Sequence, residues 1–213
     1  MLTPEAIVRL GAFAGVFGLM ALWELVAPRR RLRIGKRRWV GNLPLTIFNT
    51  ILVRVAVPLG AYGAAEVAAE RNWGLLHLVD APGFAEVAVA VLLLDLAIYL
   101  QHRVFHVVPV LWRIHKVHHA DNDFDVTTGL RFHTASIVLS MGVKMAVTIA
   151  IGASPLAVMI AETALNLTAM FNHANIRMPV GLDRILRLFI VTPDMHRVHH
   201  SIGGDEYSRN FGF

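Results

Sequence analysis

The sequence predicts an all-α fold: a multi-pass transmembrane helical bundle with a histidine-rich helical cap on the cytoplasmic side. Hydrophobic residues make up 55% of the 213-residue chain and charged residues only 16%, whereas an average soluble domain is about 25% charged. The apolar residues fall in long runs, as is typical of membrane-spanning helices. Eight histidines in three short motifs predict the cap.

The charge distribution indicates a membrane and argues against nucleic acid. Residues 29–38 hold seven Arg and Lys residues and no acid, so the net charge of +5 is concentrated in one segment. Such a run after an apolar segment is typical of the cytoplasmic flank of a span. A basic surface interleaved with aromatics, typical of nucleic-acid binding, is absent from the sequence. The chain has no cysteine, which excludes disulfides and thiolate metal sites.

The amino-terminal membrane region is predicted to comprise residues 1–83. Its predicted parts are two spans, 5–27 and 44–65, a basic cytoplasmic loop, 28–38, and a polar outer loop, 66–83. The basic residues follow the first apolar run, so we expect a retained span with its amino end outside, not a cleaved signal peptide. His77 falls in the outer loop and is interpreted as a bystander.

A third span is predicted over residues 84–101, and it leads directly into His102. Asp95 lies within it, and a carboxylate at membrane depth is costly enough to indicate a function. Asp95, His102 and His106 follow one another at helical spacing and share a face. Two interpretations stay open: Asp95 orients a metal-ligating histidine, or it is a hydrogen-bonded structural acid.

Residues 135–171 are predicted to form a helical hairpin, because Gly152 and Pro155 interrupt an apolar run that is too short for two independent spans. The returning helix carries three polar residues that we expect to face the protein interior: Glu162, Asn166 and Asn172. Asn172 is also a candidate for supporting a metal ligand. Residues 183–192 are amphipathic and predict an interfacial helix with Asp183, Arg184 and Arg187 on its polar side. This topology places every histidine except His77 on the cytoplasmic side.

The three histidine motifs predict a two-metal site. They are HRVFH at 102–106, HKVHH at 115–119 and HRVHH at 196–200. Residues three and four apart lie on one helical face, so the imidazoles of each motif can converge. Eight histidines are too many for one ion, and a proton relay or pH sensor would not need the repeated spacing. Ligand chemistry alone allows iron, zinc, copper or manganese.

A redox-active di-iron site is favoured among these metals, with zinc as a substitute. A hydrolase with two zinc or manganese ions would be expected to use bridging carboxylates. The acids beside the motifs do not repeat at a fixed spacing; they are Asp121, Asp123, Asp125 and Asp194. A non-enzymatic metal-binding membrane protein and a dizinc hydrolase remain the alternatives.

Four segments together resemble the fatty acid hydroxylase/sterol desaturase superfamily. They are 102–106, LWRIHKVHHADNDFDVTTGLRFH at 111–133, FNHANIRMP at 171–179 and VTPDMHRVHHS at 191–201. The resemblance covers roughly residues 85–213, and it implies a catalytic domain at 84–213. Members of this superfamily are integral-membrane non-haem di-iron enzymes that use O2 and electrons to hydroxylate or desaturate lipids, with the site on the cytoplasmic side.

The resemblance implies two iron ions and ten histidine ligands. These are His102, His106, His115, His118, His119, His133, His173, His196, His199 and His200. It also implies a fatty acyl or sterol-like substrate and an external electron donor that resembles cytochrome b5 or ferredoxin. Two departures are evident: Thr134 follows RFH where relatives have proline, and the sequence stops soon after NFG at 210–212. We interpret the second departure as a truncated carboxyl end.

Overall fold

The computed structural model describes residues 3–79, 82–201, 203 and 206–212. All regular structure within these residues is helical, with one isolated antiparallel bridge between Pro28 and Ile176. The α-helices are α1 (Pro4–Val26), α2 (Trp39–Ala56), α3 (Gly60–Glu70), α4 (Gly83–Val107), α5 (Pro109–His119), α6 (Thr134–Ile151), α7 (Pro155–Asn172), α8 (Val180–Leu186) and α9 (Pro193–His199). Short 3-10 helices occupy Gly35–Arg38, Leu75–Leu78 and Thr128–Leu130. The all-α prediction is confirmed.

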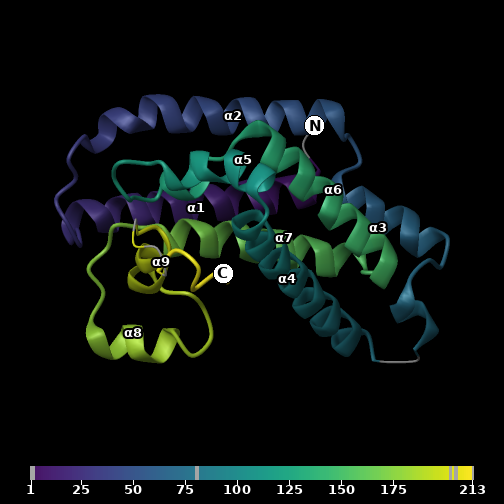
Figure 1. The fold of residues 1–213 in the computed structure, drawn as a ribbon. Helices are drawn as coiled ribbons and strands as arrows, with labels where there is room; N and C mark the ends of the chain where they lie inside the picture. The colour runs from purple at the N-terminus through teal and green to yellow at the C-terminus, as the bar shows by residue number, and fades with distance from the viewer. Residues whose placement is uncertain (1–2, 80–81, 202, 204–205, 213) are drawn as a thin grey trace.

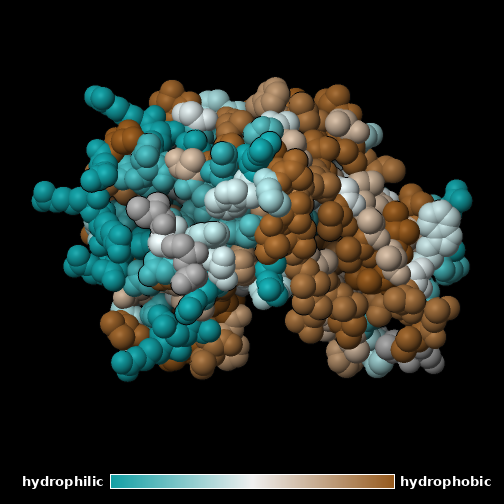
Figure 2. Space-filling model, in the orientation of Figure 1, coloured by the Kyte–Doolittle hydropathy of each residue, from teal (hydrophilic) through white to brown (hydrophobic). Residues whose placement is uncertain are grey.

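Four helical segments of the described chain are long and apolar enough to cross a membrane. They are Pro4–Val26, Gly35–Leu78, Gly83–Val107 and Thr134–Ile151. Figure 1 shows α1, α2 and α7 aligned along a common axis, with α9 toward one end of the bundle and α3 at the other. The surface changes along that direction from hydrophilic around α9 to hydrophobic over α4 and α6 (Figure 2). This arrangement confirms the multi-pass bundle with the histidine-bearing helices at its polar end.

The second predicted span differs from the structure. It begins earlier than residue 44, at Trp39, and it is interrupted between Ala56 and Gly60 instead of running straight to residue 65. Pro58 explains the interruption, because proline has no N–H to donate and clashes with the preceding turn. The chain resumes as α3, which continues to Glu70, so the outer loop begins after residue 70 and not at 66.

The predicted hairpin is confirmed, and its turn follows from local chemistry. Gly152 ends α6 in the left-handed conformation, with φ of 72°, which only glycine adopts without strain. The Ser154 hydroxyl then accepts a hydrogen bond from the Ala157 N–H and caps α7, whose first residue is Pro155. The hairpin returns the chain to the polar end of the bundle.

Helix α7 is the central helix, packed against α1, α3 and α4. Small side chains line its contacts with α3 and α4 and let the helices approach closely; they include Ala61, Ala65, Ala90 and Ala157. Glu162 is buried as predicted and forms ion pairs with Arg9, at 2.9 Å, and with Lys144. Asn172 is also fully buried, but Asn166 is exposed, so the prediction that it faces the interior is wrong.

The predicted interfacial helix corresponds to α8, which ends at Leu186 and is shorter than the predicted segment 183–192. Leu182 and Ile185 are exposed, whereas Asp183 is buried and paired with Arg187. Asp183 and Arg187 therefore lie on one side of α8, as predicted, and Arg184 is exposed. Exposed leucine and isoleucine side chains suit a helix that lies against a membrane, and the interfacial location stays a prediction.

Candidate metal centre

Nine histidines gather into two adjoining clusters at the polar end of the bundle. The first cluster contains His102, His106, His115, His119 and His199. The second cluster contains His118, His173, His196 and His200. Within each cluster the candidate ligand nitrogens lie within 4.8 Å of one another. The structure thus brings together all eight motif histidines and His173, from segments as far apart in sequence as α4 and α9.

The helical repeat explains how the motifs are shared between the clusters. His115 and His119 lie four residues apart on α5 and both belong to the first cluster, whereas His118 turns to the second. Helix α9 does the reverse, since His196 and His200 belong to the second cluster and His199 to the first. Residues four apart share a face, whereas an adjacent residue is rotated by about 100°. Each HxxHH motif therefore serves both clusters.

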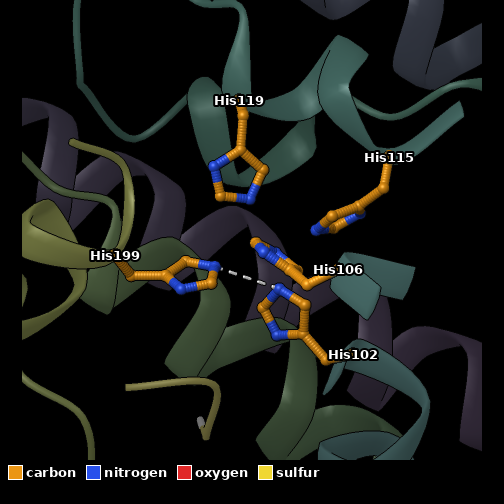
Figure 3. A group of neighbouring side chains, drawn as sticks. All are labelled: His102, His106, His115, His119 and His199. Carbon is orange, nitrogen blue, oxygen red and sulfur yellow. Dashed lines mark hydrogen bonds between the residues drawn. The ribbon is translucent and has the colours of Figure 1, made fainter. Parts of the chain in front are cut away.

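The first cluster is built by α4, α5 and α9 (Figure 3). His102 and His106 stand one turn apart on the last part of α4, and Pro109 then begins α5 and directs His115 and His119 back toward them. The five rings point to a common centre in Figure 3. His102 Nε2 and His199 Nε2 lie 3.1 Å apart across this centre.

The second cluster has His173, the residue directly after α7, at its middle. His173 Nε2 lies 3.1 Å from His118 Nε2, 3.1 Å from His200 Nε2 and 3.0 Å from His196 Nε2. The two clusters touch, because the rings of His119 and His200 stack with their centroids 4.2 Å apart. The geometry is that of two neighbouring nitrogen-lined sites.

Backbone carbonyls hold the far nitrogens of five cluster histidines. The Nδ1–H groups of His102, His118, His173 and His199 face the carbonyls of Phe211, Thr128, Ala169 and Arg209, at 2.9, 3.1, 2.7 and 2.8 Å. His196 Nδ1 lies 3.4 Å from the Asn210 carbonyl. A carbonyl only accepts, so each contact places the proton on Nδ1 and leaves Nε2 unprotonated, as an acceptor. This is the arrangement that orients ligating histidines in metal sites.

The environment keeps these imidazoles neutral. Burial lowers the pKa of His115, His118 and His196 well below the ordinary value, and repulsion between neighbouring imidazoles lowers it further. A neutral imidazole offers its lone pair to a metal, whereas an imidazolium cannot. Electrostatics therefore favours the metal-binding form at neutral pH.

The donor set fits a metal ion. Both nitrogens of His106 and the Nε2 atoms of His115 and His119 are buried and have no hydrogen-bond partner among the described residues. Nε2 atoms that face one another as acceptors leave buried lone pairs unpaired, which is unfavourable unless a cation lies between them. Both clusters consist of histidine alone within the part of the chain that the structure describes.

Three other predicted site residues lie outside the clusters. His133 is exposed, and its Nδ1 accepts a hydrogen bond from the Ala135 N–H as the amino-terminal cap of α6. Asp95 lines a cavity and forms no hydrogen bond or ion pair with a cluster histidine among the described residues. Asn172 adjoins His173 and is fully buried, and neither of its amide atoms has a partner in the described chain.

The residues whose carbonyls orient the clustered histidines were not predicted from the sequence. The tail after α9 supplies three of the five carbonyls, from Arg209, Asn210 and Phe211. Asn210 has a positive φ of 55° and donates from its Nδ2 to the Met195 carbonyl, 2.9 Å away, which turns the tail onto α9. Asparagine tolerates this backbone conformation better than most residues. That preference is the only sequence signal for this turn.

Comparisons with known proteins show what this chain is similar to. The family model described as fatty acid hydroxylase matches residues 87–213. The ornithine lipid hydroxylase OlsE of Rhizobium tropici is 30% identical over 130 residues, which cover 60% of this chain and 38% of the relative. The alkylglycerol monooxygenase of Homo sapiens is 31% identical over 113 residues, covering 50% of this chain and 23% of the relative.

The alkylglycerol monooxygenase of Danio rerio is 28% identical over 137 residues, covering 60% of this chain and 28% of the relative. The chain thus spans less than two-fifths of the length of each of these relatives. No solved structure matches it. The family match covers more than half of the chain and includes both histidine clusters, and on these grounds the chain belongs to the fatty acid hydroxylase family.

Proposed function

We propose that this protein is a membrane-bound non-haem di-iron oxygenase that hydroxylates or desaturates a lipid, using O2 and electrons from an external donor protein. The observation that carries the proposal is the pair of adjoining all-histidine clusters with mutually facing Nε2 atoms. Two irons bound there would supply the O2 activation that oxidation of an unactivated C–H bond requires. The names of the relatives, a lipid hydroxylase and a monooxygenase, favour hydroxylation.

The donor set supports iron over zinc. A dizinc hydrolase would be expected to use bridging carboxylates, whereas both clusters consist of histidine alone among the described residues.

A cavity of about 210 Å³ between α4, α6 and α7 is the proposed lipid site. Most of its lining is apolar, and it includes Phe189 and Ile190 from the segment after α8. Figure 2 shows the surface hollowed along its lower edge between α8 and α4, where a lipid can enter sideways. Ile98 of the lining lies one turn before His102, so the cavity adjoins the part of α4 that leads into the first cluster.

The chain's own residues perform two tasks in this scheme. The cavity walls exclude water and hold the aliphatic part of the substrate beside the clusters. The carbonyls of Phe211, Ala169 and Arg209 keep the ligating rings in one tautomer and one orientation. Electrons come from a donor protein of the cytochrome b5 or ferredoxin type, which we propose docks at the cytoplasmic end.

The test combines metal analysis with product analysis. Protein expressed in its native host and purified in lipid nanodiscs should contain two irons per chain. With a reductant and isotopically labelled O2, a panel of host lipids should yield a product that has gained one labelled oxygen or lost two hydrogens. Two tightly bound zinc ions would favour the dizinc hydrolase instead. Stoichiometric iron without O2 consumption on any lipid would leave a non-enzymatic metal-binding protein.

A further inference from the structure

The residues that precede the family match make close contact with the loops that carry the second cluster. The match begins at residue 87, yet Glu24 at the end of α1 and Arg38 in the basic segment are both joined by hydrogen bonds or ion pairs to residues between 121 and 175. These two side chains are not metal ligands, and neither the histidine motifs nor the cavity accounts for them.

The loop at 121–131 determines how His118 is oriented. His118 Nδ1 faces two carbonyls of this loop, Thr128 at 3.1 Å and Arg131 at 3.2 Å. The same loop packs closely against the end of α7. A Cβ added at Gly129 would lie only 2.7 Å from the Ala169 carbonyl and 3.1 Å from His173 Nδ1. Movement of this loop therefore displaces His118 and His173 together.

Arg38 holds the loop through its acids. Its guanidinium is 6% exposed and pairs with Asp121 and, at 2.6 Å, with Asp125; both carboxylates are at most 2% exposed. Asp123 accepts hydrogen bonds from the backbone N–H groups of three residues of the basic segment, Arg33, Ile34 and Gly35, at 2.7, 2.8 and 3.0 Å. The loop thus takes its shape from contacts with the basic segment.

Glu24 ties this loop to the residues after His173. One of its carboxylate oxygens accepts hydrogen bonds from the Val126 N–H and the Asn175 N–H, each at 2.7 Å. Val126 belongs to the loop that orients His118, and Asn175 lies two residues after His173. The neighbouring backbone adds to the tie, since the Arg29 N–H donates to the Asn175 carbonyl at 2.9 Å and the Arg177 N–H to the Ala27 carbonyl at 2.8 Å.

We propose that Glu24 and Arg38 are positioning residues for the second cluster, so that the amino-terminal region is part of the metal centre. Glu24 fixes the spacing between the loop that orients His118 and the turn after His173, and Arg38 fixes the shape of that loop. Both sets of contacts lie beside ligands of the second cluster, whereas the first cluster draws its ligands from α4, α5 and His199 of α9. Loss of either side chain should therefore empty the second site preferentially.

The test uses the full chain in nanodiscs and counts bound iron. Glu24→Ala removes the shared acceptor and should lower the content from two irons per chain toward one, with loss of the spectroscopic signature of a coupled iron pair. Glu24→Gln keeps a carbonyl oxygen that can accept both N–H groups and should retain most of the second iron. Arg38→Met should behave as Glu24→Ala does. Glu66→Ala is the matched control, since Glu66 is exposed on α3 at the other end of the bundle.

Several results would overturn the proposal. They are two irons and an unchanged spectrum in Glu24→Ala, equal losses in the Ala and Gln variants, equal emptying of both sites, or a loss of helix content. The inference rests on the proposed metal centre, and the iron count separates the two. A wild-type chain without two irons contradicts the proposed function, whereas a wild-type chain with two irons and unaffected variants contradicts only the positioning role.

Discussion

His118 and His173 face each other through their Nε2 atoms at 3.1 Å, although 55 residues separate them in the chain. Each turns its Nδ1 toward a carbonyl of its own surroundings, Thr128 for His118 and Ala169 for His173. Neither nitrogen of the facing pair therefore carries a proton, so the contact is a pair of acceptors that suits a shared metal ion and not a hydrogen bond.

Replacement of His173 by alanine tests this relationship. His173 is the residue closest to all three other members of the second cluster, so His173→Ala should remove one of the two irons and reduce lipid oxidation at least about 100-fold. Metal analysis and the product assay check this. His77→Ala is the control, because His77 is exposed beyond the other end of the bundle; full iron loading in His173→Ala would contradict the ligand assignment.

His133 should behave differently from the nine clustered histidines. Its Nδ1 caps α6 through the Ala135 N–H at 3.1 Å, so His133→Ala should cost about 1 kcal/mol of unfolding free energy and leave both irons in place. Thermal unfolding and metal analysis measure the two effects. His133→Asn is the control, since asparagine is a good capping residue and should restore stability. Loss of an iron in His133→Ala would show that this histidine is a ligand.

Gly129 should be intolerant of the smallest side chain. A Cβ there would lie 2.7 Å from the Ala169 carbonyl, closer than such atoms pack, so the loop must move away from α7. We expect Gly129→Ala to lower the unfolding free energy by about 1–3 kcal/mol and to weaken iron binding at the second site. Gly142→Ala is matched to it, because Gly142 is an exposed residue within α6 and a Cβ there would meet nothing within 4 Å. That variant should be neutral or slightly stabilising.

Asp95 should affect the lipid and not the metal. It is a carboxylate in a mostly apolar cavity, without an ion-pair partner among the described residues. Asp95→Leu should therefore keep both irons and raise the apparent KM for a lipid with a polar group by about tenfold, the effect of one hydrogen bond to a charged group. The apparent KM of Asp95→Asn should lie between those of the wild-type chain and Asp95→Leu. Loss of iron in Asp95→Leu would restore the interpretation that this acid orients a ligand.

The side of the membrane can be tested because the chain has no cysteine. Arg31 and Glu66 are both exposed, the first in the basic segment and the second on α3. With the basic segment in the cytoplasm, a membrane-impermeant thiol reagent added to intact cells should label Glu66→Cys and not Arg31→Cys. Lysis should make both reactive. The opposite pattern would place the metal centre outside the cell.

Much of this site could be predicted from the sequence, because the face of a helix on which a residue lies depends only on local spacing. His102 with His106, His115 with His119, and His196 with His200 are four apart, and each pair belongs to one cluster as its spacing implies. The hairpin turn was also predictable, since Gly152 and Pro155 have strong local preferences. His173 was predicted as a ligand from the family resemblance and not from the sequence around it.

The remaining features depend on how distant segments meet. No local signal says that His118 joins His173 while its neighbour His119 joins His102, because that choice depends on how α5 packs in the folded chain. The buried contacts of Arg38 could not be predicted from the sequence for the same reason, since a basic run next to an apolar segment is usually exposed to solvent. The interruption at Pro58 and the exposure of Asn166 likewise follow from packing that a linear pattern does not contain.

Helices α5 and α9 each contribute histidines to both clusters, and this has a consequence for assembly of the proposed metal centre. A helix that gives two ligands to one ion and a third to its neighbour cannot rotate about its axis without disturbing both sites. In the proposed two-ion centre, His115 and His119 would fix the rotation of α5 once the first ion is bound, and the same rotation would present His118 to the second ion. Loading of the wild-type chain should be cooperative: partly metallated preparations should contain chains with two ions and chains with none, and few chains with one.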